Sequence, residues 1–145
     1  MSPAPVLMVQ GTTSGAGKSV VATALCRLYA RRGVRVAPFK TQNMSLNSFA
    51  TPAGGEIGRS QALQAEAAGV VPHVDMNPIL LKPAGRRGCQ VVLLGRPIGH
   101  FREMDDDLLF GRLFVEAMAA LDRLRAEYDL VIAEGAGSPA EINLR

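Results

Sequence analysis

A glycine-rich segment between a short apolar run and a helical pattern limits the architectures that this chain can adopt. The apolar run is Val6–Val9, the segment Gly11–Gly17 follows it, and a helical pattern starts at Lys18. A strand, a glycine-rich turn and a helix in this order form a phosphate-binding loop, because backbone N–H groups and the positive end of the helix dipole converge on one anion. A glycine-rich turn that carries Gly-Lys-Ser by coincidence is the alternative.

The spacing inside this segment departs from the common phosphate-loop pattern by one residue. The common pattern has four residues between the first glycine and Gly-Lys-Ser or Gly-Lys-Thr. Here five residues separate Gly11 from Gly17, so the sequence predicts a subclass of the loop. Lys18 would reach the terminal phosphates of ATP, and the hydroxyl of Ser19 would bind Mg²⁺. The predicted nucleotide-binding residues are Gly11, Thr12, Thr13, Ser14, Gly15, Ala16, Gly17, Lys18 and Ser19.

Two carboxylates are candidates for the metal half of the site, which this class of loop places at the end of a neighbouring strand. Glu134 directly follows the apolar run Leu130–Ala133 and precedes two glycines, at positions 135 and 137. It is therefore the first candidate to hold Mg²⁺, and a carboxylate that only caps the strand is the alternative. Glu56 is the second candidate metal ligand, although an acidic residue at a helix start would look the same.

Strands alternate with helices along the chain, which predicts an α/β fold with a parallel sheet and right-handed crossovers. The predicted helices cover residues 17–32, 57–68 and about 105–128, and the first two end at Gly33 and Gly69. The predicted strands cover residues 6–9, 34–39, 89–94 and 130–133. Residues 41–56 are rich in Ser, Thr, Asn, Gly and Pro, which predicts a loop. In the first helix we expect Val21, Leu25 and Leu28 to form the apolar side, with Cys26 in the core.

Composition disfavours several classes of function. The chain has 145 residues, of which 48% are hydrophobic and 20% charged, and this fits one folded domain. Its net charge of +3 comes from scattered arginines, and aromatic residues make up only 5%, which disfavours a nucleic-acid partner. No signal peptide and no apolar run of membrane-spanning length is visible, so we expect a cytoplasmic location and no membrane partner. Cys26 and Cys89 lie far apart without metal-ligand neighbours, and we expect both to be structural.

Five segments of the sequence resemble the amino-terminal synthetase domain of the cobyric acid synthases. They fall in order and cover essentially the whole chain: Gly11–Ser19, Pro38–Met44, Gly54–Arg59, Asp75–Pro83 and Glu134–Arg145. The first segment alone is also similar to dethiobiotin synthetase and to the septum-site and partitioning ATPases. The stretches Gln42–Met44 and Ser138–Leu144 are far more specific to the cobyric acid synthases.

The resemblance implies a phosphate-loop NTPase fold similar to that of dethiobiotin synthetase, with a mostly parallel sheet and flanking helices. Residues 1–145 would be the amino-terminal part of an ATP-binding amide-ligase domain, and the carboxy-terminal glutamine amidotransferase domain would be absent. The family uses ATP and Mg²⁺ to convert peripheral carboxylates of adenosylcobyrinic acid a,c-diamide into amides, which gives adenosylcobyric acid in cobalamin biosynthesis. The implied reaction passes through an acyl phosphate, which is attacked by ammonia released from glutamine.

The resemblance also suggests roles for individual polar residues. Lys40, at the end of a predicted strand, would steer the substrate carboxylate or share the γ-phosphate, and a solvated lysine is the alternative. Neutral hydrogen-bonding groups would suit a corrinoid substrate dense in amides and acids. The predicted catalytic residues are Lys18, Lys40 and Glu134, and the predicted substrate-binding residues are Gln42, Asn43 and Asn47.

The sequence departs from the family pattern in two places. Gly15 stands where the family usually has an acidic residue, so a carboxylate beside the phosphates is missing. The chain stops at Arg145, before the synthetase domain of the family would end. We therefore expect an incomplete sheet in which Val6–Val9 is an exposed apolar edge, open to aggregation or to pairing in a homodimer. We also expect the isolated fold to be marginally stable.

Two other functions stay open from the sequence. One is a partner-binding ATPase switch of the partitioning type, in which nucleotide drives dimerisation. Such switches usually carry an extra lysine near the start of the loop, where this chain has Thr13. The other is a nucleotide-binding fragment without catalysis, suggested by Gly15 and the early stop. Stimulation of ADP release by cobyrinic acid diamide and ammonia would separate the ligase from both.

Overall fold

The computed structural model describes residues 2–85, 88–105 and 107–137, and a three-stranded parallel sheet lies at its centre. The strands are β1 (Val6–Val9), β2 (Val36–Phe39) and β9 (Leu130–Glu134), in the order β1-β9-β2. Both pairings are parallel, with Val9 opposite Glu134. Because parallel strands end at the same edge of a sheet, the loop after β1, Lys40 after β2 and the end of β9 come together.

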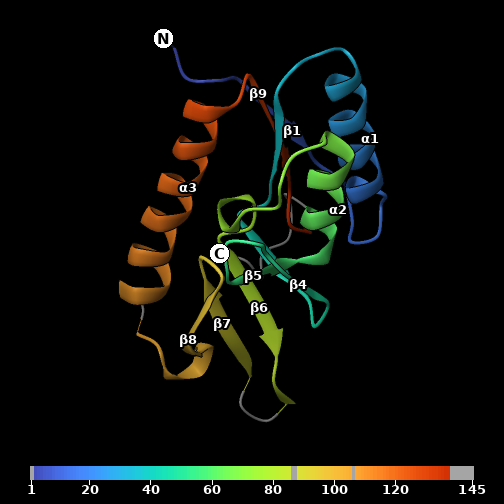
Figure 1. The fold of residues 1–145 in the computed structure, drawn as a ribbon. Helices are drawn as coiled ribbons and strands as arrows, with labels where there is room; N and C mark the ends of the chain where they lie inside the picture. The colour runs from blue at the N-terminus through green and yellow to red at the C-terminus, as the bar shows by residue number, and fades with distance from the viewer. Residues whose placement is uncertain (1, 86–87, 106, 138–145) are drawn as a thin grey trace.

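Helices cover both faces of this sheet, as predicted (Figure 1). On one face lie α1 (Lys18–Arg31) and α2 (Arg59–Ala68), which pack against each other, and on the other lies α3 (Leu113–Glu127). Val131 and Ile132 point to opposite faces of β9, because side chains alternate along a strand. Val131 packs with the core under α3, and Ile132 packs with the core under α1. The predicted α/β class is therefore confirmed.

Helices α1 and α2 end at the glycines that the sequence predicted, but the buried side of α1 differs from the prediction. Gly33 and Gly69 adopt the left-handed conformation after α1 and α2, as expected for helix ends. The buried residues of α1 are Lys18, Ala22 and Cys26, whereas Val21 and Leu28 of the predicted apolar side are exposed. These buried residues are four positions apart and share one face. Because Lys18 faces the site, the residues of α1 on the same face, Ala22 and Cys26, pack against the sheet in place of the larger Val21 and Leu28.

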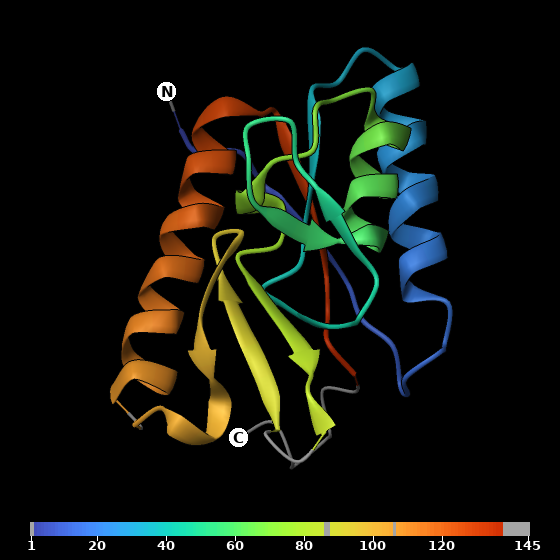
Figure 2. The same ribbon diagram turned by 60° about the horizontal axis from the view of Figure 1, so that its bottom comes forward.

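A second, mixed sheet contains the strand predicted over residues 89–94 together with strands that the sequence did not predict (Figure 2). Its strands are β3 (Gln42–Met44), β6 (Ile79–Pro83), β7 (Cys89–Leu93) and β8 (Arg96–His100), in the order β3-β6-β7-β8. The β3–β6 pair is parallel and the others are antiparallel. A separate hairpin pairs β4 (Ser48–Ala50) with β5 (Glu56–Gly58). The prediction of a loop over residues 41–56 was therefore wrong.

The predicted strand over residues 89–94 is confirmed as β7, whereas its partner β8 was missed because its sequence pattern is weak. The β7–β8 hairpin turns through Leu94 and Gly95, which both have positive φ, of 45° and 80°. Such a two-residue turn normally carries Asn-Gly or Asp-Gly, so leucine gives no hairpin signal. The partly buried Leu94 side chain packs against two apolar clusters, and this contact offsets the unfavourable backbone conformation. The sequence of β8 also gives no strand signal, because it contains Arg96, Pro97 and Gly99, which are not typical of strands.

Shorter helical segments connect these elements. A 3₁₀ helix, η1 (Val74–Met76), follows α2, and a second, η3 (Phe101–Glu103), follows β8. A π-helical segment, η4 (Asp107–Arg112), leads into α3, so the regular α-helix begins later than predicted. Leu113, Ala117 and Leu124 of α3 are buried against the rest of the fold. The motif Ser138–Leu144 lies outside the described residues.

The β1 strand forms an edge of the central sheet within the part of the chain that is described. It pairs with β9 on one side, and Val6 and Met8 are exposed. The predicted apolar edge is therefore observed there, whereas the marginal stability of the fold stays a prediction. None of the described helices is long and apolar enough to cross a membrane.

Candidate nucleotide and metal site

The predicted phosphate loop connects β1 to α1 with its backbone amides available for an anion. A turn spans Ser14 and Gly15, and apart from it no N–H group from Thr12 to Gly17 donates a well-formed hydrogen bond to an acceptor among the described residues. Gly15 and Gly17 have φ values of 75° and 92°, which only glycine adopts without strain. A Cβ at Gly11 would lie 3.0 Å from Cγ of Lys18, so the loop passes tightly over the lysine stem. Free amides ahead of a helix N-terminus are the structural basis of anion binding.

Lys18 lies across this loop rather than in solvent. Lys18 as a whole is 8% exposed, and Nζ donates a hydrogen bond of 2.9 Å to the carbonyl oxygen of Thr13. Among the described residues this carbonyl is its one acceptor, which leaves two N–H donors for a ligand. A positive charge beside free amides can therefore receive the terminal phosphates of a nucleotide.

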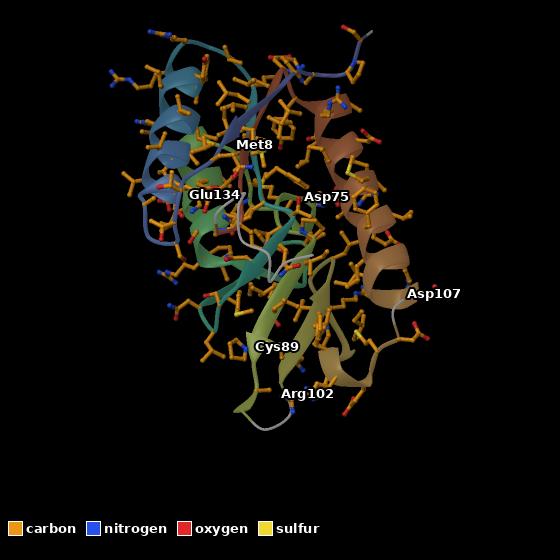
Figure 3. The ribbon with its side chains drawn as sticks, turned by 180° about the vertical axis from the view of Figure 1, so that it is seen from behind. Met8, Asp75, Cys89, Arg102, Asp107 and Glu134 are labelled. Atoms are coloured by element: carbon orange, nitrogen blue, oxygen red, sulfur yellow. The ribbon has the colours of Figure 1, made fainter. Side chains whose placement is uncertain are left out.

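Glu134 gathers three side chains from three different elements. Its Oε1 accepts hydrogen bonds of 2.8 Å from Ser19 Oγ and of 2.8 Å from Lys40 Nζ. Its Oε2 accepts one of 2.7 Å from Gln64 Nε2. Ser19 lies in the first turn of α1, Lys40 follows β2 and Gln64 lies on α2. The parallel register of the sheet brings the first two to Glu134 at the end of β9. In Figure 3, Glu134 lies beside α1 and α2, whereas Asp75 lies beside α3.

The electrostatics of this cluster favour an ionised carboxylate. Glu134 is only 3% exposed, and this burial raises its pKa. Hydrogen bonds from Lys40 and Gln64, the Lys40 charge and the Ser19 hydroxyl outweigh burial and hold the pKa of Glu134 below its usual value. A buried carboxylate oxygen beside a hydroxyl oxygen is a donor set that suits Mg²⁺. The predicted residues Ser19, Lys40 and Glu134 are therefore brought together.

Glu56, the second predicted metal ligand, is not part of this cluster. Its carboxylate contacts Lys82 Nζ on β6 at 2.9 Å and 3.2 Å. Burial raises the pKa of Glu56, but hydrogen bonds from Ser48 and Lys82 outweigh it and lower the pKa. The β4–β5 hairpin directs Glu56 to the second sheet, and this explains why it does not join Glu134. Within the described ranges no three His, Cys, Asp or Glu side chains gather as a metal site.

The predicted substrate residues fall on and after β3. Asn43 is half-buried, and its Nδ2 donates to Oε1 of Gln61 at 3.1 Å. Gln42 is also half-buried, and Asn47 is exposed. The backbone carbonyl of Asn47 accepts a hydrogen bond of 3.1 Å from the N–H of Arg59 at the start of α2. The segment is thus fixed to α2 at two points.

Three buried polar residues near the site were missed by the sequence analysis: Gln61, Gln64 and Asn77. Asn77 accepts from the N–H of Gly58 at 2.9 Å and donates to the carbonyl of Lys40 at 3.0 Å, so it fixes the backbone that carries Lys40. A Cβ at Gly58 would collide with the Asn43 side chain. The available signal was two glutamines three positions apart on the otherwise alanine-rich inner side of α2.

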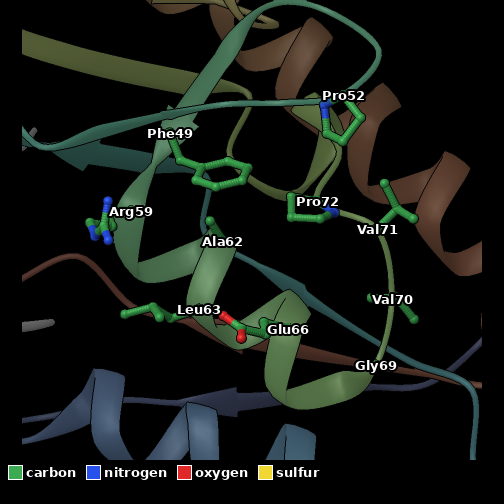
Figure 4. A pocket seen from close by; sticks show the side chains of 10 residues that line it. All are labelled: Phe49, Pro52, Arg59, Ala62, Leu63, Glu66, Gly69, Val70, Val71 and Pro72. Atoms are coloured by element: carbon green, nitrogen blue, oxygen red, sulfur yellow. The ribbon is translucent and has the colours of Figure 1, made fainter.

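A separate surface hollow of about 470 Å³ lies on the outer side of α2 (Figure 4). Its lining residues are mostly apolar and include Phe49, Ala62, Leu63 and Pro72. None of the residues that contact Glu134 lines it. The hollow is therefore distinct from the predicted nucleotide site.

Comparisons with known proteins agree with this geometry. The family model of the CobQ/CobB/MinD/ParA nucleotide binding domain matches residues 7–134. A cobyric acid synthase of Desulforudis audaxviator is 72% identical over 142 residues, which cover 98% of this chain and 29% of that protein. Those of Sorangium cellulosum and Streptomyces coelicolor are 60% and 59% identical and cover 96% of this chain.

The chain spans less than a third of the length of these curated relatives, 27–29%, and matches their amino-terminal part. The matched family segment begins in β1, contains the loop with Lys18 and Ser19, and ends at Glu134. The predicted resemblance to the cobyric acid synthases is thereby confirmed. By the match over residues 7–134, the chain belongs to the family of CobQ/CobB/MinD/ParA nucleotide binding domains.

Proposed function

We propose that this chain forms the ATP-binding part of a cobyric acid synthase, which amidates peripheral carboxylates of adenosylcobyrinic acid a,c-diamide. The relatives support the assignment, since almost all of the chain aligns with proteins named cobyric acid synthase. The observation that carries it is the shared oxygen of Glu134, because Ser19 from the loop and Lys40 from the end of β2 both contact Oε1. A phosphate-binding loop and a lysine suited to a substrate carboxylate therefore meet at one point.

The nucleotide half of the site would use the loop and two oxygen ligands. The free amides and Lys18 would hold the polyphosphate of ATP. Ser19 and Glu134 would hold Mg²⁺ through oxygen atoms, the ligands that this cation prefers. When bound, Mg²⁺ supplies charge neutralisation on the β- and γ-phosphates.

The chemistry would activate a carboxylate that is otherwise a poor electrophile. An oxygen of the substrate carboxylate forms a bond to the γ-phosphorus while the bond from that phosphorus to ADP breaks, which gives an acyl phosphate. Ammonia then attacks the acyl carbon, phosphate leaves, and loss of a proton gives the amide. Lys40 would orient the carboxylate and neutralise its charge, which is the positioning and electrostatic help that such a transfer needs.

The segment after β2 would face the corrinoid. Gln42, Asn43 and Asn47 offer neutral donors and acceptors to the amides and acids at the edge of the substrate. Met44 and Leu46, in the same segment, are exposed apolar side chains. A surface that alternates amide and apolar groups suits a large ring with polar substituents and an apolar body.

The remaining requirements lie in other parts of the enzyme or the cell. Ammonia would come from glutamine in an amidotransferase domain of the same protein, and the reaction would take place in the cytoplasm. The exposed β1 edge would allow pairing in a homodimer.

ADP release by the chain, measured with ATP, Mg²⁺, cobyrinic acid diamide and an ammonium salt, tests the proposal. The ligase predicts that the diamide and ammonia together stimulate release, and that Lys40→Met abolishes the stimulation while ATP still binds. A partner-driven switch predicts no stimulation by the diamide. Turnover that is absent with ATP bound would instead identify an inert nucleotide-binding domain.

Gly15 allows a second test of the same site. A Cβ at this position would meet no atom within 4 Å, so a side chain fits there. The φ of 75° is tolerated by aspartate better than by most residues. Gly15→Asp would restore the acidic residue that the family usually has beside the phosphates. Faster ATP-dependent amidation would show that the carboxylate takes part, and an unchanged rate would show that this chain works without it.

A further inference from the structure

Two glutamines on the inner side of α2 are buried with incomplete hydrogen bonding. Gln61 and Gln64 are each 0% exposed and lie one helical turn apart. Gln64 donates to Oε2 of Glu134, and Gln61 accepts from Asn43. Nε2 of Gln61 and Oε1 of Gln64 have no hydrogen-bond partner among the described residues. Burying an unpaired amide group is unfavourable, so packing alone does not explain a glutamine at either position.

The two oxygens of Glu134 have different kinds of partner. Oε1 contacts Ser19 and Lys40. In the proposed function, Ser19 binds Mg²⁺ and Lys40 orients the substrate carboxylate. Oε2 contacts only Gln64 among the described residues, at 2.7 Å. Because Gln64 is fully buried in the helix–sheet core, it cannot turn towards a ligand in solvent. Its hydrogen bond is therefore the contact of Glu134 that can persist when a nucleotide binds.

The orientation of a glutamate carboxylate needs such a fixed contact. The terminal torsion of Glu has a broad energy profile, so the carboxylate plane is poorly defined by the side chain itself. Groups that hydrogen-bond to a metal ligand fix its orientation and influence metal affinity. On the basis of the proposed function, we propose that Gln64 is a positioning residue, which holds Oε2 of Glu134 so that Oε1 faces the cation site.

The test is the effect of Mg²⁺ on nucleotide affinity, measured with the 145-residue chain and a fluorescent ATP analogue, in Mg²⁺ and in EDTA. Gln64→Met keeps a side chain of similar length and removes the N–H donor. We expect the increase in affinity that Mg²⁺ produces to fall by about tenfold or more, as for other partners of metal ligands. Affinity in EDTA should stay within about twofold, since the loop amides and Lys18, which bind the phosphates, are unchanged.

Gln61→Met is the matched control. Gln61 has the same burial, lies on the same helix and also has an unpaired atom, but it contacts Asn43 instead of Glu134. The Mg²⁺ effect should therefore be retained in Gln61→Met. Adding Gln64→Met to Glu134→Ala should cause no further loss, because the positioning residue acts through the carboxylate. Equal loss in both glutamine variants, or an equal loss of affinity in EDTA, would mean a merely structural role and would overturn the proposal.

A measurement on the unmodified chain covers the case in which Gln64→Met does not fold. The side-chain amide of Gln64, followed by ¹⁵N NMR, should keep its hydrogen-bonded chemical shift when Mg²⁺ and ADP are added. A shift to the value of a free amide would overturn the proposal. If Mg²⁺ does not alter nucleotide affinity in the unmodified chain, the proposed function fails as well. An intact Mg²⁺ effect in a folded Gln64→Met variant contradicts the role of Gln64 alone.

Discussion

Removing Lys40 should destabilise the fold because Glu134 would be left as a buried charge without its cation. The Glu134 side chain is 1% exposed and that of Lys40 is 13% exposed, so solvent barely screens the pair. In Lys40→Met the carboxylate keeps only two neutral donors, Ser19 and Gln64. Breaking a buried pair at one partner typically costs 3–5 kcal/mol, and the two retained hydrogen bonds place this site at the lower end, about 3 kcal/mol.

The loss of stability in Lys40→Met should depend on pH, and its direction follows from the pKa of Glu134 in the unmodified chain and in the variant. In the unmodified chain the pKa of Glu134 is lowered, so the carboxylate stabilises the fold above its unfolded pKa and this contribution disappears as the pH falls through the folded pKa. In Lys40→Met, burial remains but the lysine charge and its hydrogen bond are lost, so we expect the pKa of Glu134 to be higher than in the unmodified chain. Protonation then favours the folded variant. The difference in unfolding free energy should therefore shrink between about pH 7 and about pH 4.5.

Urea unfolding followed by circular dichroism at these two pH values measures the effect. The double variant Lys40→Met/Glu134→Gln, in which both charges are absent, should recover at least half of the lost stability at neutral pH. Arg35→Met breaks an exposed ion pair with Asp129 and should cost much less. A loss that is equal at both pH values, or a double variant no more stable than Lys40→Met, would refute the buried-charge argument.

Three other predictions concern the loop, the polar network and a cysteine. Lys18→Met should weaken ATP binding about ten- to hundredfold, the value of one charged hydrogen bond, with little change in melting temperature; calorimetric titration measures it. Gly58→Ala should lower the free energy of unfolding, measured in urea, by about 1–3 kcal/mol, because the new Cβ collides with hydrogen-bonded side chains of the polar network. Gly111→Ala is the control and should cause no such loss, because its Cβ would meet no atom within 4 Å. Burial raises the pKa of the Cys26 thiol to about 12, so iodoacetamide should not label it at about pH 8 until the chain unfolds, as mass spectrometry would show.

The sequence allowed the centre of the site to be predicted because that centre follows from simple rules. An apolar run ending in a glycine-rich turn defines β1 and the loop, and the parallel arrangement places Glu134 beside them. Glu134 and Lys40 were identifiable because each follows an apolar strand directly. The contacts of Ser19 and Lys40 with Glu134 required no knowledge of the intervening residues, since all three lie at the same edge of the sheet.

The outer part of the site depends on contacts that no local pattern records. Glu56 resembled a second metal ligand until the β4–β5 hairpin, stabilised by pairing rather than by apolar residues, directed it to Lys82. Gln64 looked like an ordinary helix residue, since its importance comes from Glu134, 70 positions away. The exposed side of α1 was misjudged because the position of Lys18, rather than hydrophobicity, sets the rotation of that helix.

The order of the central strands has a consequence for how this protein emerges during synthesis. β1 and β2 do not touch in the sheet, because β9 lies between them. The ribosome adds residues 40–129 between β2 and β9, so the first two strands are synthesised well before the strand that pairs with both. The phosphate loop is synthesised early, but Glu134 reaches it only when β9 pairs with β1. Insertion of β9 therefore joins β1 to β2 and brings Glu134 to Ser19 and Lys40 in one step.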